Sequence, residues 1–539
     1  MPEKLYLTLL GTPELRWQGQ IVPLQQTKLL ALLAFLALSP DPVRREDLAA
    51  LLWEPGKTSL TGIMERYTEL LMTVYGPGEG QRHGYPGHQE IELALLRLYR
   101  ATGEHSYLEF ARYFLNQRGQ QPYFFDQEAR ERGDDPADFW AGTYEYMQAH
   151  EPVREQDKVV GHAVRATYMY AAMADLAAED DDQALRVACE RLWEDLTRHS
   201  LYLIGGLGPS AQNEGMTQPY DLPNASAYAE TCAAVGLVFW GRRMAALTGE
   251  ARYADVMERA LYNNVLSGVS LEGDRFFYEN PLASEGHHQR WAWHACPCCP
   301  PNVARLLASL GEYIYSLSAD EVTVNLYVSG QLQAEVGGQP ITLSQESEYP
   351  WDGRITLSIG TSVPSEFSLR LRLPGWCPEA TVTLNGQTVE REPLAVTQAQ
   401  GYLTVRRVWQ SSDTLHLTLS MPAERIYARP EVSHDAGLVA VQRGPVVYCA
   451  EGVDQQGDLT RLSLPRGAEM KTRHLPELLG GVTVIEAAAR QDSETDWGTD
   501  LYRNRPPQPR AATLTLVPYA VWANRGPSPM RVWLRESVG

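Results

Sequence analysis

The sequence is poor in cysteine, with seven in 539 residues, and an odd number cannot all pair. A disulfide framework is therefore not expected to hold the fold together. Long apolar runs are also missing, because the best of them, residues 29–38, is shorter than the roughly 18 residues of a membrane span. That run lies behind charged residues, which does not fit a secretory signal. We expect no membrane association and a cytoplasmic location.

Basic residues are outnumbered, with 47 Lys and Arg against 67 Asp and Glu and a net charge of −20. This balance argues against general binding to nucleic acid or to anionic membranes. It suits an enzyme that acts on a neutral substrate.

The hydrophobic pattern changes twice along the chain. Residues 1–58 read as short strands followed by two helices, residues 59–320 show the helical period, and from about 321 the pattern has period two. Successive paired helices favour an α/α toroid over a bundle, and the period-two segments favour antiparallel sandwiches. We predict a multidomain chain, α then β: a small α/β N-terminal segment (1–58), an (α/α) barrel domain (59–320) and β-sandwiches at 321–425 and 426–539.

Three of the seven cysteines, Cys296, Cys298 and Cys299, lie within four positions. Prolines around them predict an irregular loop, on which the adjacent Cys298 and Cys299 side chains can reach one point. A helix is expected directly afterwards, at 302–316, and the macrodipole of a helix N-terminus stabilises thiolates. The three cysteines are therefore placed for chemistry as well as for packing.

The upstream stretch "AYAETCAA" offers Glu230 and Cys232 at an expected helix start, where both side chains can turn toward one centre. With Cys298 and Cys299 they would form a tetrahedral set of three sulfurs and one carboxylate, soft enough to select zinc. The spacing is not that of a standard zinc finger. On spacing alone, metal binding and plain packing remain equal alternatives.

Four long and specific stretches point to a known family: "CCPPNVARLLASLGEYIYS", "YDLPNASAYAETCAA", "GYPGHQEIELALLRLYRATG" and "QDKVVGHAVRATYMYAAMADLA". Together they resemble glycoside hydrolase family 127, the β-L-arabinofuranosidases, over residues 60–539. The resemblance implies an (α/α)6 barrel with trailing β-sandwiches and a small carbohydrate substrate. It also implies a retaining mechanism in which a zinc-bound cysteine thiolate replaces one of the usual two carboxylates.

The resemblance assigns roles to individual residues. It implies that Cys298 is the nucleophile, that Glu214 in "AQNEGM" is the general acid/base, and that His88, His162 and Tyr278 line the sugar pocket. The Zn2+ ligands that it implies are Glu230, Cys232, Cys298 and Cys299. Without the resemblance, Glu214 would read as a solvated loop residue and His162 as a satisfied core histidine.

The first 58 residues depart from this family, which has barrel helices there. They resemble instead the truncated start of a winged-helix domain of bacterial transcriptional activators. The segment through Ser59 is neutral, so nucleic-acid binding is not expected from it. We expect an incomplete barrel and leave open whether the chain is a natural fusion or a misjoined reading frame.

The sequence therefore predicts a zinc-thiolate retaining glycosidase acting on β-L-arabinofuranosides, with activity in doubt because of the missing start. The alternative is a catalytically inactive fusion that serves as a carbohydrate-binding or regulatory interaction protein. A third interpretation, a purely structural zinc site, is disfavoured because a structural site needs no acid such as Glu214. The β-sandwiches offer a surface for a homodimer.

Overall fold

The structure is a computed structural model that describes residues 5–8, 14–17, 20–22 and 59–538, except 139–141, 389–399, 456 and 494–499. The chain forms two compact units, 1–71 and 72–539. In the first, strands β1 (Leu5–Thr8), β2 (Glu14–Trp17) and β3 (Gln20–Val22) form an antiparallel sheet. The predicted winged-helix likeness of residues 1–58 otherwise lies outside the described residues.

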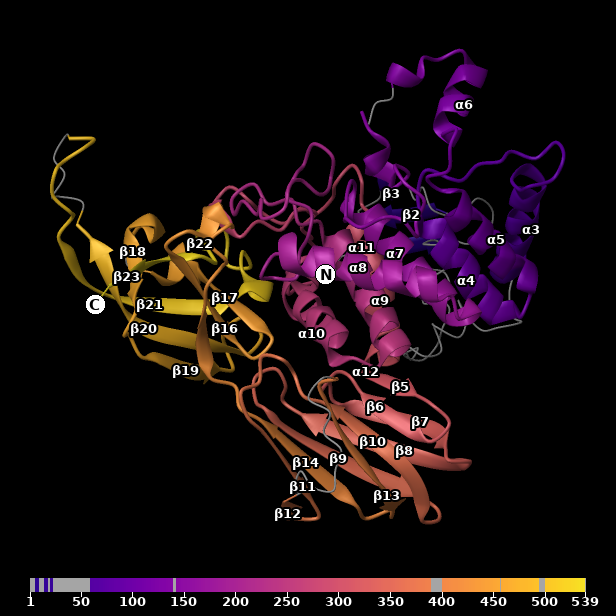
Figure 1. Ribbon diagram of the computed structural model, residues 1–539. Coiled ribbons are helices and arrows are strands. Elements are labelled where there is room, and N and C mark those ends of the chain that lie inside the picture. Colours follow the sequence, from indigo (N-terminus) through magenta and orange to yellow (C-terminus); the bar gives the residue numbers. More distant parts are fainter. Residues whose placement is uncertain are drawn as a thin grey trace. The chain divides into compact units, whose positions relative to one another are not determined.

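Helices predominate from Ser59 to Ile314, where β4 (Ala283–Glu285) is the one named strand of the described residues, and strands follow (Figure 1). The long helices are α3 (Ser59–Val74), α4 (Glu90–Thr102), α5 (His105–Gln117), α6 (Phe124–Arg132), α7 (Ala163–Asp180), α8 (Gln183–His199) and α9 (Thr231–Thr248). The later ones are α10 (Ala251–Ala260), α11 (Cys299–Ala308) and α12 (Gly311–Ile314). Helix α7 packs on α4, α8 and α9 and is buried over most of its length. The predicted order of helices before strands is confirmed.

Helix α7 begins later than the pattern indicates. The apolar period suggests one helix from about residue 156, whereas α7 starts at Ala163. Gly161 has φ +68°, and a Cβ there would lie 1.9 Å from the carbonyl oxygen of Glu145. This conformation ends the preceding segment, and His162 then caps α7. The expected helix at 302–316 is likewise split, into α11 and α12.

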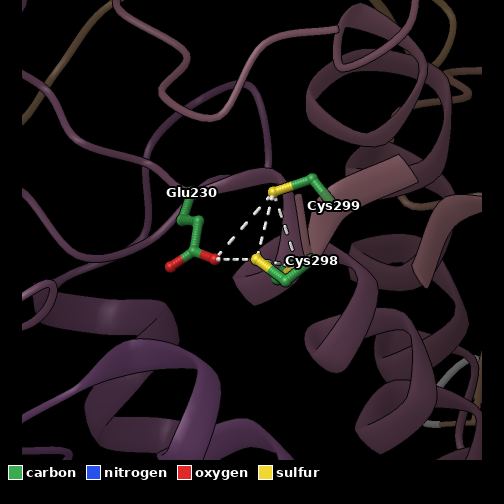
Figure 2. A group of neighbouring side chains, drawn as sticks. Glu230, Cys298 and Cys299 are labelled. Carbon is green, nitrogen blue, oxygen red and sulfur yellow. Dashed lines mark hydrogen bonds between the residues drawn. The ribbon is translucent and has the colours of Figure 1, made fainter. Parts of the chain in front are cut away.

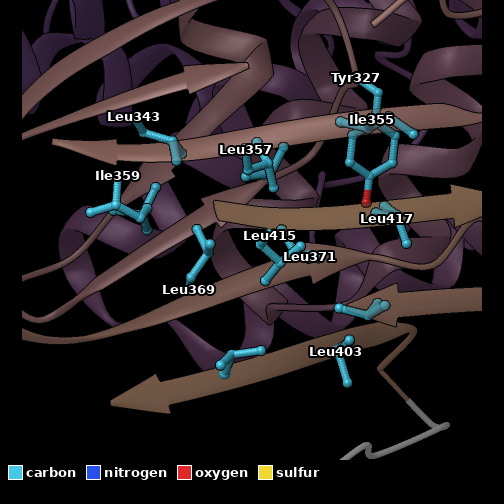
Figure 3. Close-up of a cluster of buried hydrophobic side chains, with 14 of the residues drawn as sticks. Tyr327, Leu343, Ile355, Leu357, Ile359, Leu369, Leu371, Leu403, Leu415 and Leu417 are labelled. Carbon is cyan, nitrogen blue, oxygen red and sulfur yellow. The ribbon is translucent and has the colours of Figure 1, made fainter. Parts of the chain in front are cut away.

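Two sheets form a sandwich in the middle of the chain. One sheet has the order β13-β10-β6-β5 and the other β12-β11-β14-β9-β8-β7. Leu357 and Leu415 from one sheet meet Leu369 and Leu371 from the other in a buried core (Figure 3). The strands are β5 (Tyr315–Leu317), β6 (Glu321–Val324), β7 (Gly330–Val336), β8 (Gln339–Ser347), β9 (Arg354–Thr361), β10 (Ser365–Arg372), β11 (Ala380–Leu384), β12 (Gln387–Thr388), β13 (Tyr402–Trp409) and β14 (Thr414–Leu419).

The C-terminal strands form a larger sheet with the order β15-β16-β23-β18-β20-β21-β17-β22-β4, and β19 pairs with β20. Strand β4 (Ala283–Glu285) comes from the helical part of the chain and pairs with β22. The others are β15 (Ala423–Ile426), β16 (Leu438–Arg443), β17 (Val446–Glu451), β18 (Leu462–Pro465), β19 (Met470–Leu475), β20 (Val482–Asp492), β21 (Pro509–Pro518), β22 (Pro529–Arg531) and β23 (Leu534–Ser537). No helix in the described part of the chain could cross a membrane.

A buried ion cluster joins α10 to the middle sandwich. Arg372 of β10 is fully buried and pairs with Glu258 and Asp255 of α10. Glu258 also accepts hydrogen bonds from the hydroxyl of Tyr349 (2.6 Å) and the indole N–H of Trp376 (3.0 Å). Charges buried this way are stable only when fully paired, so the cluster fixes the helix on the sandwich.

A second polar contact links the helical part to the C-terminal strands. The amide of Asn224 donates to Asp435 Oδ1 (2.8 Å), and Asp435 is only 7 % exposed. Burial raises the pKa of Asp435 to about 6. Between about pH 4 and pH 6 the folded protein therefore holds a proton on Asp435 that the unfolded chain has lost. The free energy of unfolding decreases as the pH rises through this range.

We expect Asp435→Asn to stabilise the protein, and to do so more at pH 8 than at pH 5. The asparagine removes a buried charge that is present only above pH 6, so the gain should differ between the two conditions by about 1 kcal/mol. Denaturation midpoints at both pH values measure it. Asp500→Asn, at an exposed position, serves as the control, and an equal gain at both pH values would contradict the prediction.

Candidate active site

Two helix N-termini bring the predicted metal ligands together. Glu230 is the N-cap of α9 and Cys232 lies in its first turn, while Cys298 and Cys299 form the N-cap and first residue of α11. The sulfur of Cys232 lies 3.5 Å from those of both Cys298 and Cys299, which are 3.8 Å apart. Glu230 Oε1 lies 3.6 Å from the Cys298 sulfur and 4.0 Å from that of Cys299 (Figure 2).

Three of the four residues of the cluster are buried, and the fourth is partly exposed. Glu230 and Cys232 are each 2 % exposed and Cys299 is fully buried, whereas Cys298 is half-buried. One ligand atom from each of the four residues lies within 4.8 Å of every other, so a single ion could touch all four. Glu230 Oε2 is buried without a hydrogen-bond partner in the described part of the chain. Among these four residues, only Cys298 is partly exposed, so it is the one that an incoming molecule can approach.

The electrostatics concentrate negative charge on Cys298. Hydrogen bonds from the thiols of Cys232 and then Cys299 lower the pKa of Cys298 well below that of a free thiol. Burial first, and then the charge of Cys298, raise the pKa of Glu230. Even with only protein groups present, the thiolate is therefore favoured at the accessible sulfur.

Glu214 lies beside this cluster and is surrounded by hydrogen-bond donors. The hydroxyls of Tyr228 (2.9 Å), Tyr146 (3.1 Å) and Tyr278 (3.5 Å) donate to its carboxylate. His162 Nε2 lies 3.3 Å from Glu214 Oε2. The His162 hydrogen bond, with those of the tyrosines, lowers the pKa of Glu214 to about 2. Oxygens of Glu214 and Glu230 and a ring nitrogen of His162 lie within 4.8 Å of one another.

The loop that carries Glu214 is held in a strained conformation. Glu214 has φ +50°, in the left-handed region that non-glycine residues rarely adopt. Its neighbour Gly215 packs against the backbone before α7, where a Cβ would lie 1.8 Å from the Gly161 carbonyl oxygen. Met216 N–H donates to the same oxygen (2.8 Å). Strain of this kind persists only where the surroundings enforce it, and it is concentrated at functional sites.

The hydrogen bonds of His162 define its tautomer. Its Nδ1 accepts from the backbone N–H groups of Val164 (3.2 Å) and Arg165 (3.4 Å) at the start of α7. Nδ1 therefore carries no proton, and Nε2 carries the proton that is donated to Glu214. His162 acts on Glu214 directly, a contact that its position in a helical pattern does not reveal.

His88 lies away from these contacts, at the start of α4. Its Nδ1 accepts from Glu90 N–H (3.3 Å), and its ring centroid lies 6.0 Å from that of Tyr168. Although the side chain reaches solvent, crowding by protein and the Arg165 cation lower the pKa of His88 to about 4. His88 is therefore a neutral group at neutral pH, able to donate or accept a hydrogen bond.

Sequence reasoning missed Tyr146, Tyr228 and Arg165. Arg165 donates to the carbonyl of Gly87, next to His88, and lies 5.2 Å over the ring of Tyr146. Tyr228 lies two residues before the predicted ligand Glu230, in the stretch "AYAETCAA", and this proximity could have indicated a place in the site. Tyr146 comes from a distant 3-10 turn, and nothing in its spacing connects it with Glu214.

Comparison with known proteins first defines the class, that of the glycoside hydrolases. Residues 54–312 match the description "Beta-L-arabinofuranosidase, GH127 catalytic domain", 321–421 the GH127 middle domain, and 423–535 the "Glycoside hydrolase family 127 C-terminal domain". The chain belongs to glycoside hydrolase family 127 and is an enzyme of the glycosidase type.

Individual relatives agree over most of the chain. A curated non-reducing end β-L-arabinofuranosidase of Bifidobacterium longum subsp. longum is 36% identical over 508 residues, which are 89% of this chain and 76% of the relative. The crystal structure of a GH127 β-L-arabinofuranosidase from Geobacillus stearothermophilus T6 is 49% identical with a TM-score of 0.87, covering 89% of this chain and 77% of that one. A further GH127 β-arabinofuranosidase structure is 39% identical, with a TM-score of 0.80 and coverage of 89% and 74%.

Proposed function

We propose that this protein is a retaining glycosidase that cleaves β-L-arabinofuranosides, with Cys298 as nucleophile, Glu214 as acid/base and a zinc ion in the cysteine cluster. The observation that carries the proposal is the placement of one accessible sulfur among three buried ligand residues beside a strained glutamate. The names of the relatives supply the sugar.

The donor set fits zinc. Tetrahedral coordination with Zn–S bonds of about 2.3 Å separates the sulfurs by about 3.8 Å. The three sulfur separations are 3.5, 3.5 and 3.8 Å. Three of the four ligand residues offer soft sulfur atoms, and within the described residues Glu230 Oε2 is a buried acceptor without a hydrogen-bond donor. Zinc would be held by Glu230, Cys232, Cys298 and Cys299, and when bound it keeps the coordinating thiols deprotonated.

Two steps follow from the residues present. In the first, the Cys298 sulfur attacks the anomeric carbon while the bond to the leaving oxygen breaks and Glu214 gives its proton to that oxygen. In the second, Glu214 takes a proton from water, the water oxygen attacks the same carbon, and the carbon–sulfur bond breaks to return the thiolate. Two inversions give net retention of configuration.

The surroundings of Glu214 suit both of its roles. The donors His162, Tyr146 and Tyr228 favour the carboxylate, the form needed to activate water. The acid form is favoured by the neighbouring ligand set, because three thiolates and one carboxylate exceed the charge of a divalent ion by two negative charges. We infer that His162 and Tyr278 orient Glu214 and the sugar, and that His88 contacts the sugar from the α4 side.

We further propose that residues 59–320 form an incomplete (α/α)6 barrel that is the catalytic domain, and that 321–425 and 426–539 are β-sandwich domains. The family matches support these divisions, and the two sheets that enclose one core support the first sandwich. A homodimer and a cytoplasmic location stay predictions, which light scattering and cell fractionation test.

Removal of the metal should abolish hydrolysis reversibly. The purified protein is expected to contain about one zinc per chain and to hydrolyse an aryl β-L-arabinofuranoside with the β anomer as first product. Prolonged chelation should lower both zinc content and rate, and added Zn2+ should restore them together. A metal-free active enzyme would overturn the zinc assignment, and an α anomer as first product would overturn the double displacement.

A further inference from the structure

A row of aromatic rings leads away from Glu214. Tyr278, whose hydroxyl donates to Glu214, has its ring centroid 5.0 Å from that of His294. The His294 ring stacks in turn on Trp291, with centroids 4.3 Å apart and an interplanar angle of 8°. We call Tyr278, His294 and Trp291 the aromatic row. It begins at the acid/base and is carried by the loop that leads to the nucleophile.

Burial decreases along the aromatic row. Tyr278 is 7 % exposed, His294 and Trp291 are half-buried, and Trp293 beside them is 75 % exposed. The row therefore connects the closed catalytic centre with the surface.

The backbone beneath the row is rigidly held. Trp291 N–H donates to Phe276 O (2.8 Å), and Phe276 N–H donates to Trp291 O (2.9 Å). Next to them, Arg290 is 4 % exposed, donates to the carbonyls of Ser267 (3.0 Å) and Trp522 (2.7 Å), and lies 4.3 Å over the Phe277 ring. The loop is thus fixed between the end of the π-helical turn Leu261–Val265 and the C-terminal strands. A binding surface preformed in this way loses little entropy when it is occupied.

We propose that Trp291 and His294 form the leaving-group subsite and bind a second sugar ring through its apolar C–H face. This inference rests on the proposed function. Because Glu214 protonates the leaving oxygen, the leaving group must lie on the Glu214 side, where the aromatic row begins. A flat pair of stacked rings offers contact area at low entropic loss.

The test compares two substrates in the zinc-loaded full chain: a disaccharide with a β-L-arabinofuranosyl group on a second arabinose, and methyl β-L-arabinofuranoside. Trp291→Ala should lower kcat/KM about tenfold for the disaccharide and leave the methyl glycoside within about twofold. Trp291→Phe, which keeps a smaller ring, should give an intermediate loss for the disaccharide. Tyr502→Ala removes an 86 % exposed ring elsewhere and should change neither.

The methyl glycoside has no second sugar ring, so it distinguishes a loss of binding to that ring from damage to the loop. An equal loss on both substrates, in Trp291→Ala or in Trp291→Phe, would overturn the subsite and leave Trp291 with a packing role. Unchanged rates on both substrates would overturn it as well. Should the unaltered chain hydrolyse neither substrate, the proposed function itself fails, an outcome distinct from an active enzyme that is indifferent to Trp291.

Discussion

Cys298→Ser is expected to lower kcat by roughly 10⁴-fold or more, since loss of a covalent nucleophile removes the whole reaction path. The serine hydroxyl is far less acidic than the thiol, and it is a poor ligand in a site built for sulfur. The other three ligands are buried and point at one another, so none of them can reach a sugar in its place. Initial rates on an aryl β-L-arabinofuranoside measure the loss.

The chain offers a matched control two residues away. Cys296 is exposed and lies outside the ligand set, so Cys296→Ser should retain both zinc and activity. Zinc content distinguishes the role of Cys298 as nucleophile from its role as ligand. Cys232 is a ligand only, so Cys232→Ser should lose activity only in proportion to its loss of zinc. Full activity in Cys298→Ser would remove the nucleophile assignment, and a glycosylated Cys298 peptide trapped with an activated substrate would support it.

The ligand cluster was within reach of the sequence for a physical reason. Glu230 and Cys232 stand at one predicted helix start and Cys298 and Cys299 at another, and helix N-termini present adjacent side chains to a common point. The change from helical period to period two likewise gave the order of helices and strands. The local sequence pattern was enough to predict those site residues that lie at the start of a helix.

The surroundings of Glu214 could not be read in the same way. Its donors Tyr146, Tyr228 and Tyr278 come from segments 14 to 68 residues away, and only the folded chain brings them together. The apolar period also placed His162 inside a helix, because periodicity cannot register the left-handed conformation of Gly161. That conformation makes His162 the N-cap, and α7 begins at Ala163. Long-range contacts and backbone reversals are the features that a one-dimensional pattern omits.

Glu214→Gln should separate the two chemical steps. A substrate with a poor leaving group needs the proton of Glu214, so its hydrolysis should fall by roughly 10³-fold. A dinitrophenyl glycoside needs little protonation, so Cys298 should still be glycosylated rapidly and one equivalent of phenol should appear as a burst. Turnover should then stall, because a glutamine cannot take the proton from water.

Azide should restore turnover of the dinitrophenyl substrate by Glu214→Gln, since this anion attacks without losing a proton. The product should be the β-L-arabinofuranosyl azide, because azide replaces water on the face opposite to the Cys298 sulfur. Glu272→Gln, an exposed control, should show neither burst nor rescue. An α-linked azide would show that azide displaces the phenol directly, without a covalent intermediate on Cys298. Hydrolysis by Glu214→Gln at the rate of the unaltered enzyme would show that the acid/base is another group. A burst followed by azide rescue requires both a covalent intermediate and a missing base, which are the two roles that the geometry gives to Cys298 and Glu214.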